Sequence, residues 1–170
     1  MKGEMRGRPS IQLTVPGSLR YRQVAVRVVA EAARMVSEGT SEPPVNGADG
    51  YDLRNPFDSA FVSAFAEIFN NIAIHAYQRT ATGAIELIIT IGEDYLEVEI
   101  RDDGVAFDLD AVAPLALDEL HEGGMGIHIA RTMLDELHYE AGPPNLWRLR
   151  KALPVASASD TPSGSTLTMS

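Results

Sequence analysis

Cysteine is absent from this chain, which excludes a disulfide framework and any thiolate metal site. Long apolar runs are absent too: none reaches the ~18 residues of a membrane span, and the N-terminal MKGEMRGRPS has no apolar core that would make it a secretory signal. Basic residues are few, and the net charge of −10 argues against non-specific nucleic-acid binding. We therefore expect a cytoplasmic protein with no direct contact to nucleic acid or membrane.

With 170 residues and 45% hydrophobic content, the chain is long enough for one domain with a real core. Residues 1–10 are polar and predict a flexible tail, and the low-complexity residues 154–170 predict a disordered one. The segment 39–56 is rich in Gly, Pro and Asn and predicts a long loop. The folded domain is therefore expected to span residues 11–153.

Hydrophobic periodicity predicts the elements between these limits. Helices are expected from Ser18 to about Ser37, from Pro56 to near Gln78 and from about Met125 to Glu136; the first is predicted to group Val24, Val28, Ala32 and Met35 on one face. Strands are expected at 11–15, 84–91, 95–101, 138–142 and 146–153, with a hairpin turn at 92–94. This order predicts an α+β two-layer sandwich, with a mixed, mainly antiparallel sheet and helices on one face.

The second expected helix carries two stripes. Glu67, Asn71 and His75 recur at spacings of four and form one stripe; the predicted core face is a separate one, Phe61, Phe65, Ile68 and Ile72. Asn offers a neutral hard oxygen to Mg²⁺, and Glu can accept a proton beside a γ-phosphate. Taken alone, the same residues are more typical of an ordinary polar helix surface with a packed histidine.

The strand YLEVEIR ends in Asp102-Asp103-Gly104. Tyr95, Glu97 and Glu99 alternate with apolar residues, and that alternation places Asp102 on the inward face. A buried carboxylate needs a donor, and the exocyclic amine of adenine is one. Gly104 would let the backbone approach the base closely. The competing interpretation is a plain Asp-Asp-Gly turn.

The third pattern is Gly123-Gly124-Met125-Gly126 ahead of an amphipathic helix. Glycines there free backbone amides to point at phosphate, and a helix N-terminus favours the anion. The preceding segment, Leu109 to Gly124, is expected to be a lid loop. The buried stripe of the helix is predicted to be Ile127, Ile129, Ala130, Met133, Leu134 and Leu137.

The three patterns in this order predict an ATP-Mg site, and the set resembles the ATPase superfamily shared by gyrase, heat-shock chaperones, histidine kinases and mismatch-repair proteins. DDGVAFD and GGMGIHIARTMLDEL are similar to the anti-sigma factor serine/threonine kinases. The resemblance covers residues 10–153 and implies the Bergerat type of ATP-binding fold. It implies Glu67 as catalytic base, Asn71 as Mg²⁺ ligand and Asp102 with Gly104 at adenine. Gly124, Met125 and Gly126 would contact the nucleotide.

The resemblance also implies partners. Such proteins bind a sigma factor and phosphorylate a Ser or Thr of an anti-anti-sigma (STAS-domain) protein, and relatives dimerise through the N-terminal strand and helix. Two departures stand out: Ala106 replaces a glycine common in the family, and no Lys or Arg lies between Asp108 and Gly124. A partner-sequestering module with little kinase activity is therefore a competing function.

Two further functions compete less well. A detached histidine-kinase catalytic domain is disfavoured because no long helix pair with a phosphoacceptor His precedes the domain. A metal hydrolase using His75, His121, His128 and His138 lacks compact ligand spacing.

Overall fold

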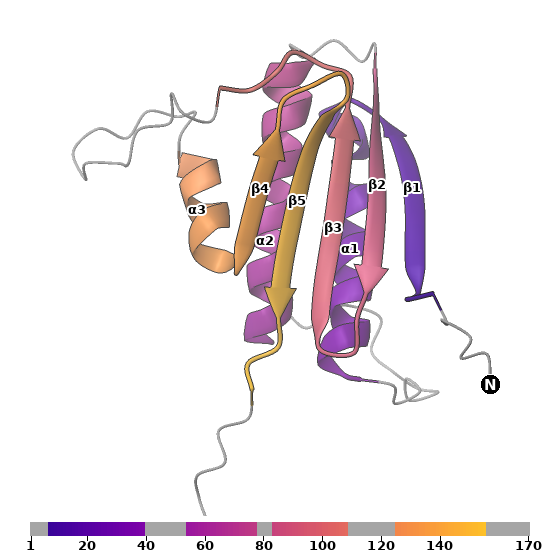
Figure 1. The fold of residues 1–170 in the computed structure, drawn as a ribbon, viewed down its shortest axis with the longest axis vertical. Coiled ribbons are helices and arrows are strands. Elements are labelled where there is room, and N and C mark those ends of the chain that lie inside the picture. The colour runs from indigo at the N-terminus through magenta and orange to yellow at the C-terminus, as the bar shows by residue number, and fades with distance from the viewer. Residues whose placement is uncertain (1–6, 40–53, 78–82, 109–124, 156–170) are drawn as a thin grey trace, which may run out of the picture.

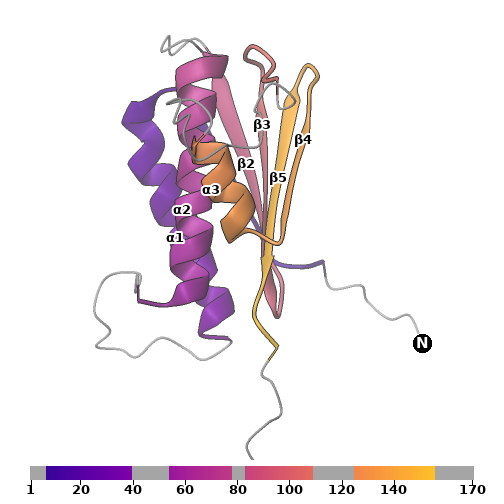
Figure 2. The same ribbon diagram turned by 90° about the vertical axis from the view of Figure 1, so that its left-hand side faces the viewer.

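The computed structural model describes residues 7–39, 54–77, 83–108 and 125–155, which form a sheet and a layer of helices on one of its faces (Figures 1 and 2). The order of the main elements is β1–α1–α2–β2–β3–α3–β4–β5. The predicted α+β two-layer architecture is confirmed. The expected lid loop with Gly124, residues 1–6 and 156–170 of the expected tails, and residues 40–53 of the expected long loop lie outside the described residues. Ser10, expected in the N-terminal tail, is instead the first residue of β1.

The sheet has the strand order β1-β2-β3-β5-β4, and each neighbouring pair is antiparallel. Its strands are β1 Ser10–Pro16, β2 Ala84–Ile91, β3 Tyr95–Asp102, β4 Glu136–Glu140 and β5 Asn145–Ala152. The predicted β2–β3 hairpin is confirmed. Because β5 lies between β3 and β4, its first residue lies beside the last residue of β3, which places two distant segments at one site.

The helices are α1 Arg22–Ser37, α2 Pro56–Asn71 and α3 Met125–Met133. Asn55 caps α2, its side chain accepting from the backbone N–H of Phe57 and Asp58 at 2.9 and 3.3 Å. Past Asn71 the chain continues in a π-helical turn, Ile72–Ala76, and ends close to the predicted position. Helix α2 lies at the centre of the layer and contacts both α1 and α3.

The core lies between α2 and the inner face of the sheet. The predicted core residues of α2, Phe61, Phe65, Ile68 and Ile72, are all buried, which confirms that face. They pack in one cluster with inward side chains of the strands: Ile85, Leu87, Ile89, Val98, Ile100, Trp147 and Leu149. This continuous apolar layer supplies most of the driving force for folding.

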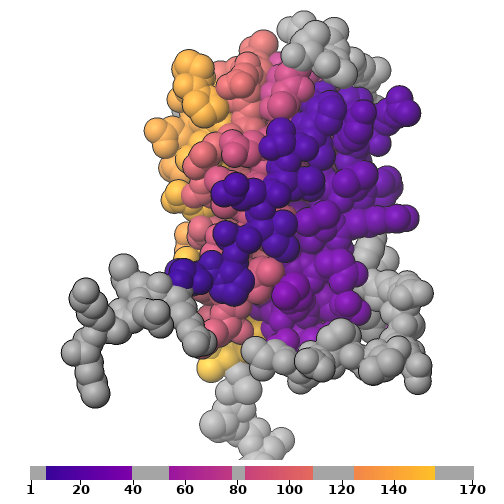
Figure 3. Space-filling model, turned by 90° about the vertical axis from the view of Figure 1, so that its right-hand side faces the viewer, coloured from indigo at the N-terminus to yellow at the C-terminus, as the bar shows by residue number. Residues whose placement is uncertain are grey.

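The predicted buried face of α1 is wrong in part. Val24 is 49% and Met35 53% exposed, and Val28 is only partly buried, whereas Ala32 is buried. The residues that face the core are instead Ala25, Val26, Val29, Ala30, Ala32, Ala33 and Val36. Four of these seven are alanines and three are valines, so α1 packs against α2 and the sheet through small apolar side chains. Segment 7–39 covers much of the side of the molecule seen in Figure 3.

Helix α3 is shorter than predicted. It ends at Met133, and Glu136 and Leu137 belong to β4. The backbone N–H of Asp135 donates to the carbonyl oxygen of Arg150 at 3.0 Å. The chain is therefore hydrogen-bonded to β5 from this residue on, and the helix ends before it. Within α3 the fully buried residues are Ile127 and Ala130, while Ile129 and Met133 are partly exposed.

The outer face of the sheet carries charged side chains that alternate with the core residues, as predicted for β3. Tyr95 lies on this face yet is buried, because the guanidinium groups of Arg8 and Arg150 lie 5.4 and 4.2 Å from its ring centroid. Ion pairs join β3 and β5 on this face: Glu99 lies 3.3 Å from Arg101 and 3.1 Å from Arg148, and Glu97 lies 3.6 Å from Arg150.

Candidate functional site

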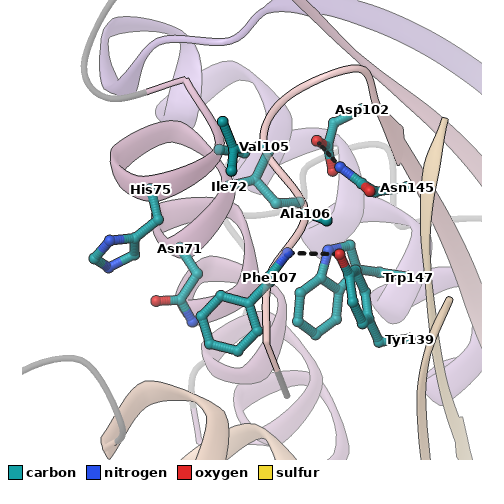
Figure 4. A pocket seen from close by; sticks show the side chains of 11 residues that line it. Asn71, Ile72, His75, Asp102, Val105, Ala106, Phe107, Tyr139, Asn145 and Trp147 are labelled. Atoms are coloured by element: carbon teal, nitrogen blue, oxygen red, sulfur yellow. Dashed lines mark hydrogen bonds between the residues drawn. The ribbon is translucent and has the colours of Figure 1, made fainter. Parts of the chain in front are cut away.

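A small pocket opens where the C-terminal end of α2 meets the ends of β3 and β5 (Figure 4). Its volume is about 40 Å³, which is room for a few water molecules. The helix contributes polar side chains and the strands contribute a carboxylate and aromatic rings. The lining residues are Asn71, Ile72, His75, Ala76, Asp102, Val105, Ala106, Phe107, Tyr139, Asn145 and Trp147.

Asp102 lies at the floor of this pocket. As the last residue of β3 it faces inward, as the alternation predicts, and it is 2% exposed. Its Oδ1 accepts hydrogen bonds from Asn145 Nδ2 at 2.9 Å and from the Gly104 backbone N–H at 3.0 Å. Burial raises the pKa of Asp102, and these two hydrogen bonds oppose the rise. No described residue donates to Oδ2, so this oxygen is free to accept from a ligand.

Gly104 holds the segment after Asp102 against the helix end. A Cβ at this position would lie 2.6 Å from both the Cβ and the carbonyl oxygen of Ala76. That carbonyl accepts from the Val105 backbone N–H at 2.9 Å. The close approach seen at Gly104 is to the end of the helix; the predicted approach of its backbone to a base stays a prediction.

Tyr77 is a site residue that the sequence analysis missed. Its hydroxyl donates to the Ala84 carbonyl at 2.8 Å and accepts from the Asp103 backbone N–H at 3.1 Å. Its ring lies between Gly17 and Gly83, where a Cβ on either glycine would overlap it. Tyr77 thus joins the end of the helix to three strand ends and fixes the residue next to Asp102. The local sequence pattern does not indicate this role, because Gly17 and Gly83 are both distant from Tyr77 in the sequence.

Asn71 lines the pocket from the helix side, as the stripe predicts. Its Nδ2 is buried and has no hydrogen-bond partner in the described part of the protein, so this donor is not used by the fold. The described residues hold no cluster of three or more His, Cys, Asp or Glu that would form an all-protein metal cage. A single neutral oxygen fits Mg²⁺, which takes few protein ligands and completes its shell with water and phosphate.

Glu67 lies one helical turn away and does not line this pocket. It borders a second cavity, of about 420 Å³, between the three helices. A Cβ on Gly126 would lie 2.5 Å from Glu67 Oε2, so the carboxylate reaches the first turn of α3. Gly126 is therefore small because Glu67 occupies the space beside it. Met125, the first residue of α3, is exposed.

Three aromatic rings form the far wall of the pocket (Figure 4). The ring centroids of Tyr139 and Trp147 lie 4.3 Å apart, and those of Phe107 and Trp147 5.9 Å apart. Tyr139 Oη accepts from the Phe107 backbone N–H at 2.7 Å, and burial raises its pKa. Such rings offer apolar faces to a planar base. Tyr139 and Trp147 are direct partners in the register of β4 and β5, which brings their rings together.

The histidines do not converge. His75 is exposed at the pocket wall, and His128 and His138 are exposed on α3 and β4. His121 lies outside the described residues. The described residues therefore give no support to a histidine-based metal hydrolase.

The fold and the site define a class: a two-layer α+β domain whose buried strand-end carboxylate faces a helix with Asn and Glu one turn apart. Residues 17–151 match the family model described as "Histidine kinase-like ATPase domain", and the chain belongs to this family. The sequence resemblance is thereby confirmed at the level of the family.

Two curated relatives are similar to part of the chain. "Serine-protein kinase RsbW" of Bacillus subtilis (strain 168) is 32% identical over 85 residues, and the protein of the same name from Bacillus licheniformis 31% over 85 residues. Each match covers 45% of this chain and 53% of the relative, so the chain spans about half the length of the curated relatives it matches.

Among solved structures, the "Histidine kinase domain from Erythrobacter litoralis EL346 blue-light activated histidine kinase" is similar, with 18% identity and a TM-score of 0.47. That match covers 89% of this chain and 66% of the other. Within the described ranges, no helix combines the length and the apolar character needed to cross a bilayer.

Proposed function

We propose that this protein binds ATP with Mg²⁺ and transfers the γ-phosphoryl group to a Ser or Thr of an anti-anti-sigma (STAS-domain) partner, and so controls the availability of a sigma factor. The observation that carries the proposal is Asp102, a buried carboxylate with one free oxygen at the floor of a pocket walled by aromatic rings. Membership of the ATPase family and similarity to relatives named serine-protein kinase support it.

Asp102 would recognise the base. Its Oδ2 accepts from the exocyclic amine of adenine, while Phe107 and Trp147 supply apolar contact to a planar ring. Leaving this oxygen unpaired inside the pocket costs free energy, and a donor on the ligand recovers it. Adenine nucleotides are therefore preferred over a base that presents an acceptor at this position.

Asn71 and Glu67 would act at the phosphate end. ATP would supply the phosphoryl group and Mg²⁺ would neutralise its charge, with Asn71, which lines the pocket, holding the ion through its side-chain oxygen. Glu67 would accept the proton of the attacking hydroxyl. Its position beside the first turn of α3 supports this, because a helix N-terminus favours nearby negative charge, including a phosphate.

A sequestering module that binds nucleotide but transfers little phosphate is a second candidate. It is favoured by the absence of Lys and Arg between Asp108 and Gly124, which leaves that segment without a cation for the phosphates. Both candidates share the Asp102 pocket. They differ in turnover, which labelled ATP-Mg and anti-anti-sigma proteins of the same genome would measure as phosphoserine or phosphothreonine.

Three substitutions separate the roles. Asp102→Asn should abolish ATP binding measured by calorimetry. Glu67→Ala should keep binding but lower phosphoryl transfer by about 10²–10⁴-fold, the usual share of a general base. Asn71→Ala should weaken the Mg²⁺ dependence of binding. Glu93→Ala, in the exposed turn of the β2–β3 hairpin, is the matched control and should change nothing. Full transfer by both helix variants would make the Glu67–Asn71 stripe structural.

A further inference from the structure

Asn145 is the most deeply buried polar side chain at the site, and the functions above give it no role. It is 1% exposed and begins β5, where it pairs directly with Asp102 at the end of the β3–β5 ladder. Its side chain points to the inner face, in phase with Trp147 and Leu149. An uncharged polar group is rarely buried this completely unless each of its hydrogen-bonding atoms has a partner.

The hydrogen bonds of Asn145 fix the orientation of its carboxamide. Its Oδ1 accepts from the backbone N–H of Gly142 at 3.2 Å. Because an N–H can only donate, the oxygen must face Gly142, and the amino group must face the other way. There Nδ2 donates to Asp102 Oδ1 and to the Gly104 carbonyl oxygen, both at 2.9 Å. Both of its protons are thereby used.

This arrangement decides which oxygen of Asp102 is available. Oδ1 accepts from Asn145 and from the Gly104 N–H, whereas no described residue donates to Oδ2. Figure 4 shows the two side chains facing each other across the pocket floor. The carboxylate is held in one rotamer with one oxygen occupied and one presented.

We propose that Asn145 is a positioning residue for nucleotide recognition: it clamps Asp102 Oδ1, keeps the carboxylate able to accept, and presents Oδ2 to the exocyclic amine of adenine. The inference rests on the proposed function, since it assumes that Asp102 binds the base. It adds a determinant of base specificity. A carboxylate that only accepts rejects guanine, which carries an oxygen where adenine carries its amine, whereas a protonated carboxyl could donate to that oxygen.

The electrostatics of the pocket agree with this role. Burial raises the pKa of Asp102, and the hydrogen bond from Asn145 is the largest effect that lowers it. The other titratable groups that face Asp102 are Asp103, Tyr77 and Tyr139, with His75 on the pocket wall. None of these supplies a hydrogen bond to the Asp102 carboxylate. Loss of the Asn145 donor should therefore raise the pKa of Asp102 further.

The proposal predicts opposite pH dependences of the ATP affinity for two substitutions at Asn145. Asn145→Leu keeps the volume and removes the donor, so ATP should bind roughly ten- to a hundredfold more weakly. Its affinity should fall further as the pH is lowered, and its preference for ATP over GTP should shrink. Asn145→Asp places a second carboxyl group against Asp102. Its ATP affinity should be low at pH 8 and recover toward pH 6, because the new carboxyl can then donate to Asp102 as the amide does.

The test is calorimetric titration of the full chain with ATP and GTP between pH 5.5 and 8.5, with Gln12→Glu as the amide-to-acid control on the exposed face of β1. The opposed pH profiles support the clamp. Wild-type affinity and pH profile in both variants overturn it and leave the proposed function intact. Should Asn145→Leu not fold, Asn145→Asp alone decides by the recovery, or its absence, at low pH.

A second readout separates the inference from the proposed function. The pKa of the Asp102 carboxyl, followed by carbon NMR without nucleotide, should be higher in Asn145→Leu than in the wild type. An unchanged pKa overturns the clamp even where ATP binds. A wild-type protein that binds no ATP overturns the proposed function and with it the positioning role.

Discussion

At the scale of single residues, the site is a set of polar groups that the fold shields from water. Asp102 is ionisable and buried, and Asn71 has a buried amide nitrogen without a partner in the described part of the chain. Groups of this kind cost stability and are found where a ligand repays the cost. Asn145 and Tyr77 contribute by hydrogen bonding, since Asn145 holds Asp102 in place and Tyr77 holds Asp103.

Asp102→Asn should therefore stabilise the fold while removing nucleotide binding. Burial raises the pKa of Asp102 above its unfolded value, so the folded state binds the proton more tightly. The free energy of unfolding then falls as the pH rises from the unfolded-state pKa through the folded-state pKa, and the full cost remains above that window. Urea denaturation should find the variant more stable at pH 7, with the difference narrowing in acid. A variant less stable than the wild type at pH 7 contradicts this reasoning.

Gly83→Ala should destabilise the protein through Tyr77. The added Cβ would overlap the Tyr77 ring, and overpacking of this kind costs about 1–3 kcal/mol. Gly7→Ala is the control, because no atom lies within 4 Å of the Cβ it would add. Thermal unfolding of both variants compares them directly. Equal melting temperatures would mean that the ring moves aside without cost.

At the scale of elements, the C-terminal part of α2 organises the site. One turn carries Glu67 toward α3, the next carries Asn71 into the pocket, and the π-helical turn Ile72–Ala76 brings the Ala76 carbonyl oxygen to Val105. π-helical turns often mark functional sites in helices. The short α3 completes the arrangement, because Gly126 in its first turn leaves room for the Glu67 carboxylate.

Gly126→Ala should separate stability from catalysis. Alanine favours a helix over glycine by up to about 1 kcal/mol, so stability should hold or rise. The new Cβ would displace Glu67 Oε2, and a misplaced catalytic group can cost about 10²-fold in rate. A double-mutant cycle with Glu67→Ala tests the cause by phosphoryl-transfer assay, since the glycine change should have no further effect once the carboxylate is gone. Additive losses would assign Gly126 a role apart from Glu67.

At the scale of the whole molecule, the sheet order joins segments that are distant in sequence. β5 lies between β3 and β4, so Asn145 and Trp147 reach the pocket that Asp102 and Asn71 also line. Segment 7–39 covers another side of the molecule (Figure 3). On it, two apolar residues of α1, Val24 and Met35, are exposed. A homodimer through the N-terminal strand and helix, which the resemblance implies, stays a prediction.

Val24→Glu combined with Met35→Glu should leave the fold intact, since substitutions at exposed positions usually change stability by less than about 0.5 kcal/mol. The pair should convert a dimer to a monomer in light scattering, because burying two carboxylates at an interface is costly. Arg27→Glu, an exposed position on the same helix, is the matched charge control. If the mass of the Val24→Glu, Met35→Glu variant equals that of the wild type, any interface lies elsewhere.

The sequence by itself determined the elements, the inward phase of Asp102 and the core face of α2. These follow from periodicity, because residues two or about 3.6 positions apart share a face whatever the rest of the chain does. The same rule could have placed Asn145 on the inward face with Trp147 and Leu149. It did not, because the strand was predicted to begin one residue later.

Only the tertiary structure decided how these faces meet. It turned the alanine-rich stripe of α1 inward, because close helix packing selects small side chains over large ones. Helix α3 ends earlier than predicted, because Glu136 and Leu137 pair with residues of β5 in the sheet. The tertiary structure also brought Asn145 to Asp102 and placed the Tyr77 ring between two glycines, since such contacts depend on strand order and register, which no local pattern records.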